Sequence, residues 1–178
     1  MAKKTPRTAL RLLLLRHAKS AWPEGVADHD RPLAERGRKS APVIGAYMAR
    51  EKLIPDLALV SPARRAQETW ALVREALPDG IAEREAAGIY EVPADNILAV
   101  IQSVEHSIRT LLVVGHNPGM EDLASSLAKD GDVDAMARMT EKFPTAGLAV
   151  IDFDLEEWSA AATGTGHLER FVTPRFLG

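Results

Sequence analysis

The chain has 178 residues, which is enough for one apolar core, and we predict that residues 1–178 form a single domain. It contains no cysteine, which excludes disulfides, thiolate nucleophiles and cysteine-ligated metals. A formal net charge of −3 provides no overall basic field, so we expect no nucleic-acid partner.

Basic residues and a short apolar run open the chain. The run spans only Leu12 to Leu15 and is bounded by Arg11 and Arg16. A secretion signal needs about 7 to 15 apolar residues, and a membrane-spanning helix needs about 20. We therefore expect a soluble, cytoplasmic protein that does not interact with membranes.

Short aliphatic runs alternate with stretches of helical spacing along most of the chain. In chain order, buried strands are predicted over residues 12–15, 57–60 and 111–114, and helices over residues 33–52, 63–76, 94–105 and 119–129. After the segment 131–145, which has no clear pattern, residues 148–153 and 168–172 predict two strands that form a closing hairpin or edge pair. The alternation of strand and helix predicts a layered α/β fold.

Polar residues that can bind phosphate follow each of the three buried strands. They are Arg16-His17 after the first strand, SPARRA after the second and GHNPG after the third. In open α/β sheets ligands bind beyond the carboxyl ends of the strands, so these segments are expected to converge. Ser61-Pro62 and Asn117-Pro118 are also typical of helix starts, where backbone amides favour an anion.

These residues suit phosphoryl transfer without a metal or another cofactor. The guanidiniums of Arg16 and Arg65 can neutralise a phosphate dianion, and a neutral His17 can attack phosphorus. His116 would stabilise the transition state best when protonated. Glu91 is the candidate general acid, on its position in the sequence alone.

The motifs RHAKSAW, DHDRPLAERG, SPARRAQET and VGHNPGMEDLA resemble the histidine phosphatase superfamily, which is phosphoglycerate mutase-like, over nearly the whole chain. RHAKS resembles its SixA-type phosphohistidine phosphatase branch, although the family hallmark Arg-His-Gly is Arg-His-Ala here. The resemblance implies a three-layer α/β/α fold with a mostly parallel mixed sheet. It also implies that His17 is the phosphorylated nucleophile, and that Arg16, Arg65 and His116 bind the phosphoryl group.

The resemblance bears on the remaining site residues as well. It favours Arg65 over Arg64, because the matching arginine precedes Ala66, and it places the family's acid at Glu91, which short SixA-type members can lack. Further substrate contacts are predicted for Ser20, Arg31 and Asn117. Asp28, His29 and Asp30 are adjacent residues that seldom converge on one ion, so we interpret them as part of a loop that orders the site and expect no metal.

Three functions are compatible with this pattern. The leading hypothesis is a metal-independent phosphatase that dephosphorylates phosphohistidine, or another phosphoramidate, on a protein through a phosphohistidine intermediate. The second is a small-molecule phosphomonoesterase, and the third is a non-catalytic phosphate-binding regulatory module. The expected partner is therefore a phosphorylated protein or a small phosphorylated metabolite.

Overall fold

The computed structural model describes residues 9–178, which are organised around one mixed sheet of seven strands in the order β3-β2-β4-β1-β6-β7-β5. The strands are β1 (Leu10–Arg16), β2 (Leu57–Val60), β3 (Ala82–Glu85), β4 (Thr110–Gly115), β5 (Ala128–Gly131), β6 (Leu148–Phe153) and β7 (Gly166–Val172). Of the neighbouring pairs, β1–β6 and β6–β7 are antiparallel and the other four are parallel. The predicted mostly parallel mixed sheet is confirmed.

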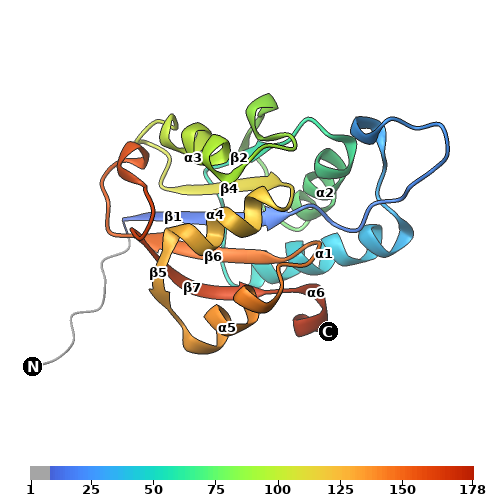
Figure 1. Cartoon of the computed structure of the whole chain (residues 1–178). Helices are drawn as coiled ribbons and strands as arrows, with labels where there is room; N and C mark the ends of the chain where they lie inside the picture. The colour runs from blue at the N-terminus through green and yellow to red at the C-terminus, as the bar shows by residue number, and fades with distance from the viewer. Residues whose placement is uncertain (1–8) are drawn as a thin grey trace, which may run out of the picture.

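The three aliphatic runs form the adjacent parallel strands β2, β4 and β1 in the middle of this sheet. Their central residues are buried on both faces, as their uninterrupted aliphatic sequence predicts. The register aligns Arg16 with Gly115 and Val60 with Val114, so the three strands end at one edge of the sheet. In Figure 1 this edge lies to the right, where the arrow of β1 ends.

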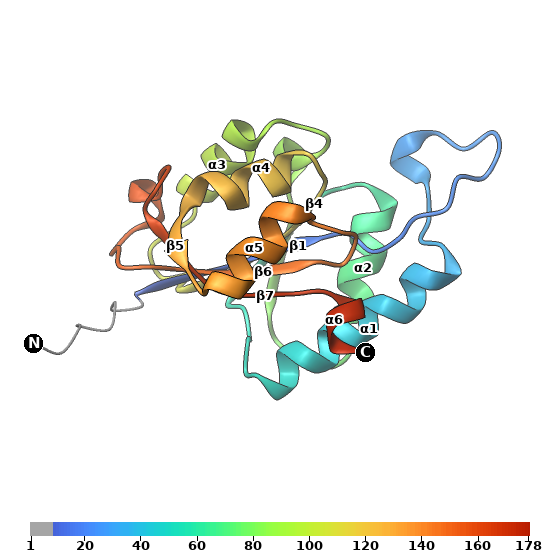
Figure 2. The same ribbon diagram turned by 60° about the horizontal axis from the view of Figure 1, so that its bottom comes forward.

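Helices cover both faces of the sheet, which gives three layers (Figures 1 and 2). The helices are α1 (Glu35–Arg50), α2 (Arg64–Arg74), α3 (Ala94–Gln102), α4 (Gly119–Leu127), α5 (Val133–Glu141) and α6 (Pro174–Leu177). Side chains of α3, α4 and α5 pack with Leu12 and Leu14 on one face, whereas α1, α2 and α6 pack with Leu13 and Leu15 on the other. The alternation of β1 side chains between faces thus builds two apolar cores on one strand.

Two edge strands, β3 and β5, and two helices, α5 and α6, lie outside the elements that the sequence predicts. β3 has the sequence AERE and is exposed throughout, and β5 has the sequence AKDG, so neither carries an aliphatic signal. The helix predicted over residues 119–129 ends at Leu127, where the chain turns directly into β5. The two strands predicted near the C-terminus pair as β6 and β7, but the edge beyond them is formed by β5.

The dipeptides Ser61-Pro62 and Asn117-Pro118, which are typical of helix starts, lie just before the helices that follow them. α2 starts at Arg64 and α4 at Gly119, so Ser61 and Asn117 precede the helices and are not their N-caps. Both side chains nevertheless accept hydrogen bonds from nearby backbone amides, Ser61 Oγ from Ala63 (3.3 Å) and Asn117 Oδ1 from Glu121 (3.2 Å). Both residues therefore bind backbone amides near a helix start without being its N-cap residue.

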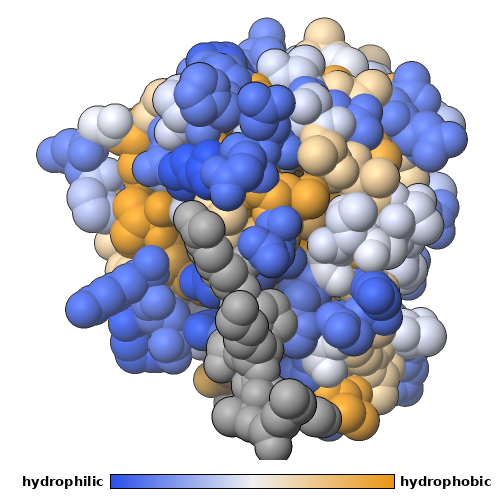
Figure 3. Space-filling view, turned by 90° about the vertical axis from the view of Figure 1, so that its left-hand side faces the viewer, coloured by the Kyte–Doolittle hydropathy of each residue, from blue (hydrophilic) through white to orange (hydrophobic). Residues whose placement is uncertain are grey.

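Figure 3 shows the end of the molecule opposite to the carboxyl ends of β1, β2 and β4, with hydrophilic residues beside smaller hydrophobic areas. The basic residues that open the chain precede residue 9 and lie outside the described residues. Of the helices in residues 9–178, none combines the length and apolar character that crossing a membrane requires.

Candidate active site

The carboxyl ends of the central strands border a cleft of about 270 Å³. The cleft is lined by the predicted site residues Arg16, His17, Ser20, Arg31, Arg65, Glu91 and Asn117. The remaining predicted residue, His116, lies beside it, with its ring centroid 5.1 Å from that of His17. The structure therefore brings together all the site residues that the sequence analysis selected, from segments as distant as β1 and β4.

His17 follows β1 and is held in one orientation by the backbone. Its amide donates to the carbonyl of Gly115 at 3.0 Å, and its ring Nδ1 lies 2.8 Å from the carbonyl oxygen of Ala18. Because a carbonyl only accepts, Nδ1 carries the proton and Nε2 carries the lone pair. Burial, with smaller contributions from Arg65 and Arg16, lowers the pKa of His17 to about 4. His17 is thus a neutral imidazole with a nucleophilic nitrogen at pH 7.

His116 follows β4 and is held by the hydroxyl of Ser61, which lies 2.7 Å from Nε2. Ser61 Oγ accepts from the amide of Ala63, so it can donate its own proton to Nε2 and leave Nδ1 as the N–H group. Burial, followed by the nearby His17 ring and the charge of Arg65, lowers the pKa of His116 to about 3. The ring of His116 is therefore neutral in the free site, and a protonated His116 beside a bound phosphoryl group stays a prediction.

Arg65 lies in the first turn of α2 and is almost fully buried. It donates to the carbonyl oxygen of Asp28 at 2.7 Å, to Asp28 Oδ2 at 3.1 Å and to Glu91 Oε1 at 2.8 Å. Its neighbour Arg64 is mostly exposed and forms an ion pair with Glu68 at 3.6 Å. Arg65, and not Arg64, therefore lies in the cleft.

Two buried nitrogens at the site have no hydrogen-bond partner within residues 9–178. They are Arg16 Nε and His116 Nδ1. Arg16 donates from Nη1 to the carbonyl of Phe143 at 3.1 Å, which orients its guanidinium, and burial lowers its pKa. Buried donors are nearly always paired in proteins, so two unpaired donors beside His17 indicate a site built for an anion.

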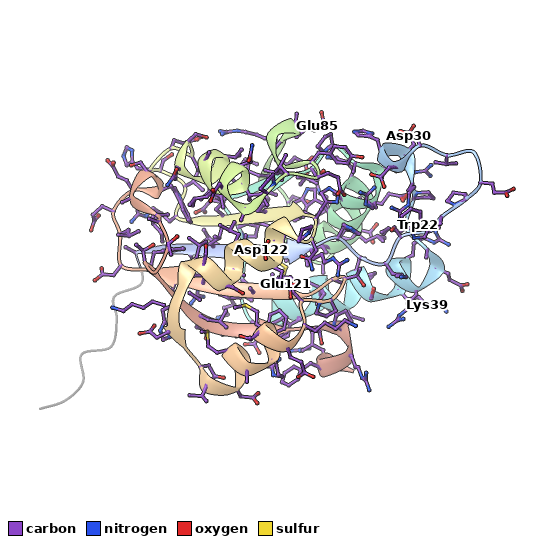
Figure 4. All side chains as sticks on the ribbon, viewed as in Figure 1. Trp22, Asp30, Lys39, Glu85, Glu121 and Asp122 are labelled. Atoms are coloured by element: carbon purple, nitrogen blue, oxygen red, sulfur yellow. The ribbon has the colours of Figure 1, made fainter. Side chains whose placement is uncertain are left out.

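The loop between β1 and α1 is ordered by Arg31 and Asp28. Arg31 donates to the Ala21 carbonyl, to Asp28 and to Ser20, and its guanidinium stacks over Trp22 at 3.2 Å. Arg31 and Ser20, which are predicted to contact the substrate, are thus hydrogen-bonded to each other, and both line the cleft. Figure 4 shows Trp22 and Asp30 on this loop, at the right of the view.

Asp28 links this loop to Arg65 and Tyr90. The hydroxyl of Tyr90, then Arg31 and Arg65, hold the pKa of the Asp28 carboxyl well below its usual range. The sequence analysis interpreted Asp28 only as part of an ordering loop and did not select Tyr90. The spacing of Asp28 and Arg31, three residues apart, was a signal for their ion pair, but nothing in the sequence pointed to Tyr90.

Within residues 9–178, no group of three His, Asp or Glu side chains is arranged to hold a metal ion.

Asn117 and Glu91 complete the wall of the cleft. Asn117 donates from Nδ2 to the carbonyl of Phe143 at 2.9 Å, the same carbonyl that Arg16 uses. Glu91 has a φ of 49°, which is rare for a residue with a side chain, and its Oε1 lies 3.5 Å from His116 Nδ1. Asn117 thus positions Arg16 indirectly, whereas Glu91 faces both His116 and Arg65.

The comparisons with known proteins agree with this geometry. The model of the histidine phosphatase superfamily (branch 1) matches residues 12–92. The uncharacterized protein Rv1276c of Mycobacterium tuberculosis is 39% identical over 163 residues, covering 90% of this chain and 100% of that protein.

Two similar solved structures are candidate phosphohistidine phosphatases named SixA. The protein from Agrobacterium tumefaciens is 32% identical, with a TM-score of 0.77 over 94% of this chain and 100% of that chain. The protein from Nakamurella multipartitia is 26% identical, with a TM-score of 0.83 over 96% of this chain and 99% of that chain. The chain belongs to the histidine phosphatase superfamily and is a phosphatase of the histidine phosphatase type.

Proposed function

We propose that this phosphatase removes the phosphoryl group from phosphohistidine, or from another phosphoramidate, on a protein. The reaction proceeds through a phosphohistidine intermediate on His17 and needs no metal. The similarity to SixA proteins supports the substrate class. The neutral His17 with a free Nε2, beside the unpaired donors of Arg16 and His116, supports the mechanism.

In the first step Nε2 of His17 attacks phosphorus in line with the leaving group. The new P–N bond forms as the bond from phosphorus to the substrate nitrogen breaks, and that nitrogen takes a proton from water. Arg16 and Arg65 neutralise the phosphoryl oxygens, and the Nδ1–H of His116 donates to one of them. The charge that builds up in the transition state is thus met by fixed donors.

In the second step water attacks the phosphorylated His17. A P–O bond forms, the bond to Nε2 breaks, and inorganic phosphate leaves with the proton balance restored by solvent. The phosphate dianion would raise the pKa of His116 relative to the free site, because an opposite charge nearby favours the protonated form. A protonated His116 therefore becomes possible when substrate is bound.

The ion pair between Glu91 and Arg65 is the observation that favours a phosphoramidate. Glu91 Oε1 lies 2.8 Å from Arg65 Nη2, so this oxygen accepts from the guanidinium instead of facing a leaving group as a donor. An ester leaving group needs a donated proton, whereas a P–N bond is labile once its nitrogen is protonated by solvent. The site is therefore better suited to phosphoramidates than to esters.

The second candidate function, a small-molecule phosphomonoesterase, is favoured by the backbone of Glu91. Its left-handed φ of 49° costs free energy, and such strain is typical of functional positions. This function requires that substrate binding draws Arg65 onto the phosphoryl group and releases Glu91 to act as the acid. The two functions thus differ in what they require of Glu91.

A rate comparison with Glu91→Gln separates the two functions. We expect the wild-type protein to prefer a phosphohistidine protein over phosphoserine, sugar phosphates and nucleotides, and Glu91→Gln to change the phosphohistidine rate by less than about threefold. General acid catalysis contributes roughly 100-fold or more. If the wild-type protein prefers esters, and Glu91→Gln lowers the rate with esters by roughly 100-fold, the phosphomonoesterase is supported instead. Glu85→Gln, which alters an exposed carboxylate on β3, is the matched control.

A further inference from the structure

A groove lined by positive charges leads away from the catalytic cleft. Its middle section, of about 190 Å³, is lined by Lys19, Arg36, Lys142 and Arg175, and no Asp or Glu is among its lining residues. Lys19 and Thr145 also line the catalytic cleft, so the two spaces lie next to each other. We call this space, with the outer section described next, the basic groove.

The outer section of the basic groove adds an apolar surface. It has a volume of about 440 Å³ and shares Lys142 and Arg175 with the middle section. Phe176 lies on it with 57% of its surface exposed, and the guanidinium of Arg138 lies 4.2 Å from the centre of the Phe176 ring. Glu141 also lines this section, and Arg138 is paired with Asp134 at 3.0 Å, so the charges that remain for a ligand here are those of Lys142 and Arg175. An exposed aromatic side chain beside these two cations suits a segment that is both acidic and partly apolar.

The cations of the middle section lack the carboxylate partners that most other arginines of the protein have. Arg11, Arg74 and Arg84 form ion pairs with Asp152, Glu83 and Glu105. In contrast, the four cations of the middle section have no carboxylate within 4.0 Å in residues 9–178, and residues 1–8 contain no acidic side chain. In a chain with a net charge of −3, unpaired cations along one groove repel each other and attract an anion.

We propose that the basic groove binds an acidic segment of the protein substrate, next to the phosphorylated residue. This inference rests on the proposed function, because it assumes that the phosphoryl group is carried by a protein. The cleft, the middle section and the outer section follow one another and share lining residues, which favours an extended chain over a compact metabolite that would leave the outer section and Phe176 unused. Charge complementarity predicts that aspartates or glutamates of this segment lie against the middle section. The exposed Phe176 predicts that an apolar side chain of the segment packs on its ring.

Paired peptide substrates test this proposal. Each synthetic peptide carries one phosphorylated residue, flanked on either side by aspartates in one version and by asparagines in the other, and each version is made with phosphohistidine and with phosphoserine. We expect kcat/KM to be about fivefold higher with aspartates, through KM, since two exposed charge pairs together contribute roughly this factor. The advantage should shrink as salt is raised.

The double variant Lys142→Gln/Arg175→Gln should abolish the preference for aspartate and leave the turnover of p-nitrophenyl phosphate unchanged, because neither residue lines the catalytic cleft. The matched control Lys129→Gln/Arg50→Gln removes two exposed cations elsewhere and should keep the preference. Equal kcat/KM for the two flanks, or a preference that survives in Lys142→Gln/Arg175→Gln, would overturn the proposal.

The same experiment separates a failure of the groove proposal from a failure of the proposed function. The groove proposal concerns the ratio of kcat/KM between aspartate-flanked and asparagine-flanked peptides that carry the same phosphorylated residue. The proposed function concerns the ratio of kcat/KM between phosphohistidine and phosphoserine peptides. Fructose 1,6-bisphosphate and fructose 6-phosphate are measured as well. If the flanks have no effect and the variant loses a preference for the bisphosphate, the partner is a small polyanion and the protein segment is excluded.

Discussion

The two ends of the central strands differ in whether their polar groups are hydrogen-bonded. Where β2 and β4 begin, Asp56 Oδ2 accepts from the amides of Arg109 and Thr110, both at 2.9 Å, and all three groups are satisfied. Where the strands end, Arg16 Nε and His116 Nδ1 are buried without a partner in residues 9–178. The first end therefore contributes stability, whereas the second holds groups in states that cost stability and that, under the proposed function, bind phosphate.

Replacing Arg65 should produce the largest loss at the carboxyl ends of the strands. We expect Arg65→Ala to reduce kcat/KM about 100-fold or more, because it removes one preorganised donor from the transition state. Steady-state rates with a phosphohistidine protein measure the effect. Arg64→Ala is the control, since Arg64 is exposed and adjacent in sequence, and it should retain at least half of the activity. Equal losses in the two variants would remove Arg65 from its proposed role.

The free energy of unfolding should depend on pH through His17. Its pKa is lowered to about 4 in the folded state, against an ordinary value near 6.5, so between these values the unfolded state binds more protons. Stability should therefore fall as pH falls from 6.5 towards 4, by about 2 kcal/mol at pH 5 from His17 alone.

Urea unfolding at pH 7.5 and pH 5 measures this dependence. His17→Asn should lose about 2 kcal/mol less than the wild type on acidification. His106→Asn changes an exposed histidine and should keep the wild-type dependence. If His17→Asn and the wild type respond alike, His17 is not held neutral by the fold.

A change at the opposite end should affect stability and leave catalysis unaltered. Asp56→Asn weakens two hydrogen bonds at the start of β4, and we expect a loss of about 1 kcal/mol in the free energy of unfolding. Because this end is remote from the cleft, kcat and KM should stay within about twofold of the wild type. A large change in kcat would show that the two ends are coupled.

The sequence was sufficient for the elements that carry strong local signals. The aliphatic runs predicted the central strands, and the polar residues after them predicted which side chains meet at the cleft. The exposed sequence AERE of β3 has no apolar pattern, so its position at the sheet edge depends on pairing with β2. The bond between Asp28 and Arg65 joins residues 37 positions apart, and only the fold brings them together.

The protonation state of His116 was beyond sequence reasoning for a different reason. Chemistry alone suggested a protonated ring beside a phosphoryl group. The structure adds the burial of the ring, the nearby His17 and the charge of Arg65, which lower its pKa in the free site. Likewise, the motif around Arg31 indicated the right loop but did not reveal that its guanidinium bonds to Ser20, Asp28 and Ala21.

Detection of the phosphoenzyme tests the nucleophilic role of His17 most directly. The protein is mixed with a radiolabelled phosphohistidine protein in excess chelator, quenched within the turnover time and digested. We predict an acid-labile, alkali-stable phosphoryl group on His17, and neither label nor turnover in His17→Ala. Turnover that survives in His17→Ala, or label on any other residue, would contradict the account.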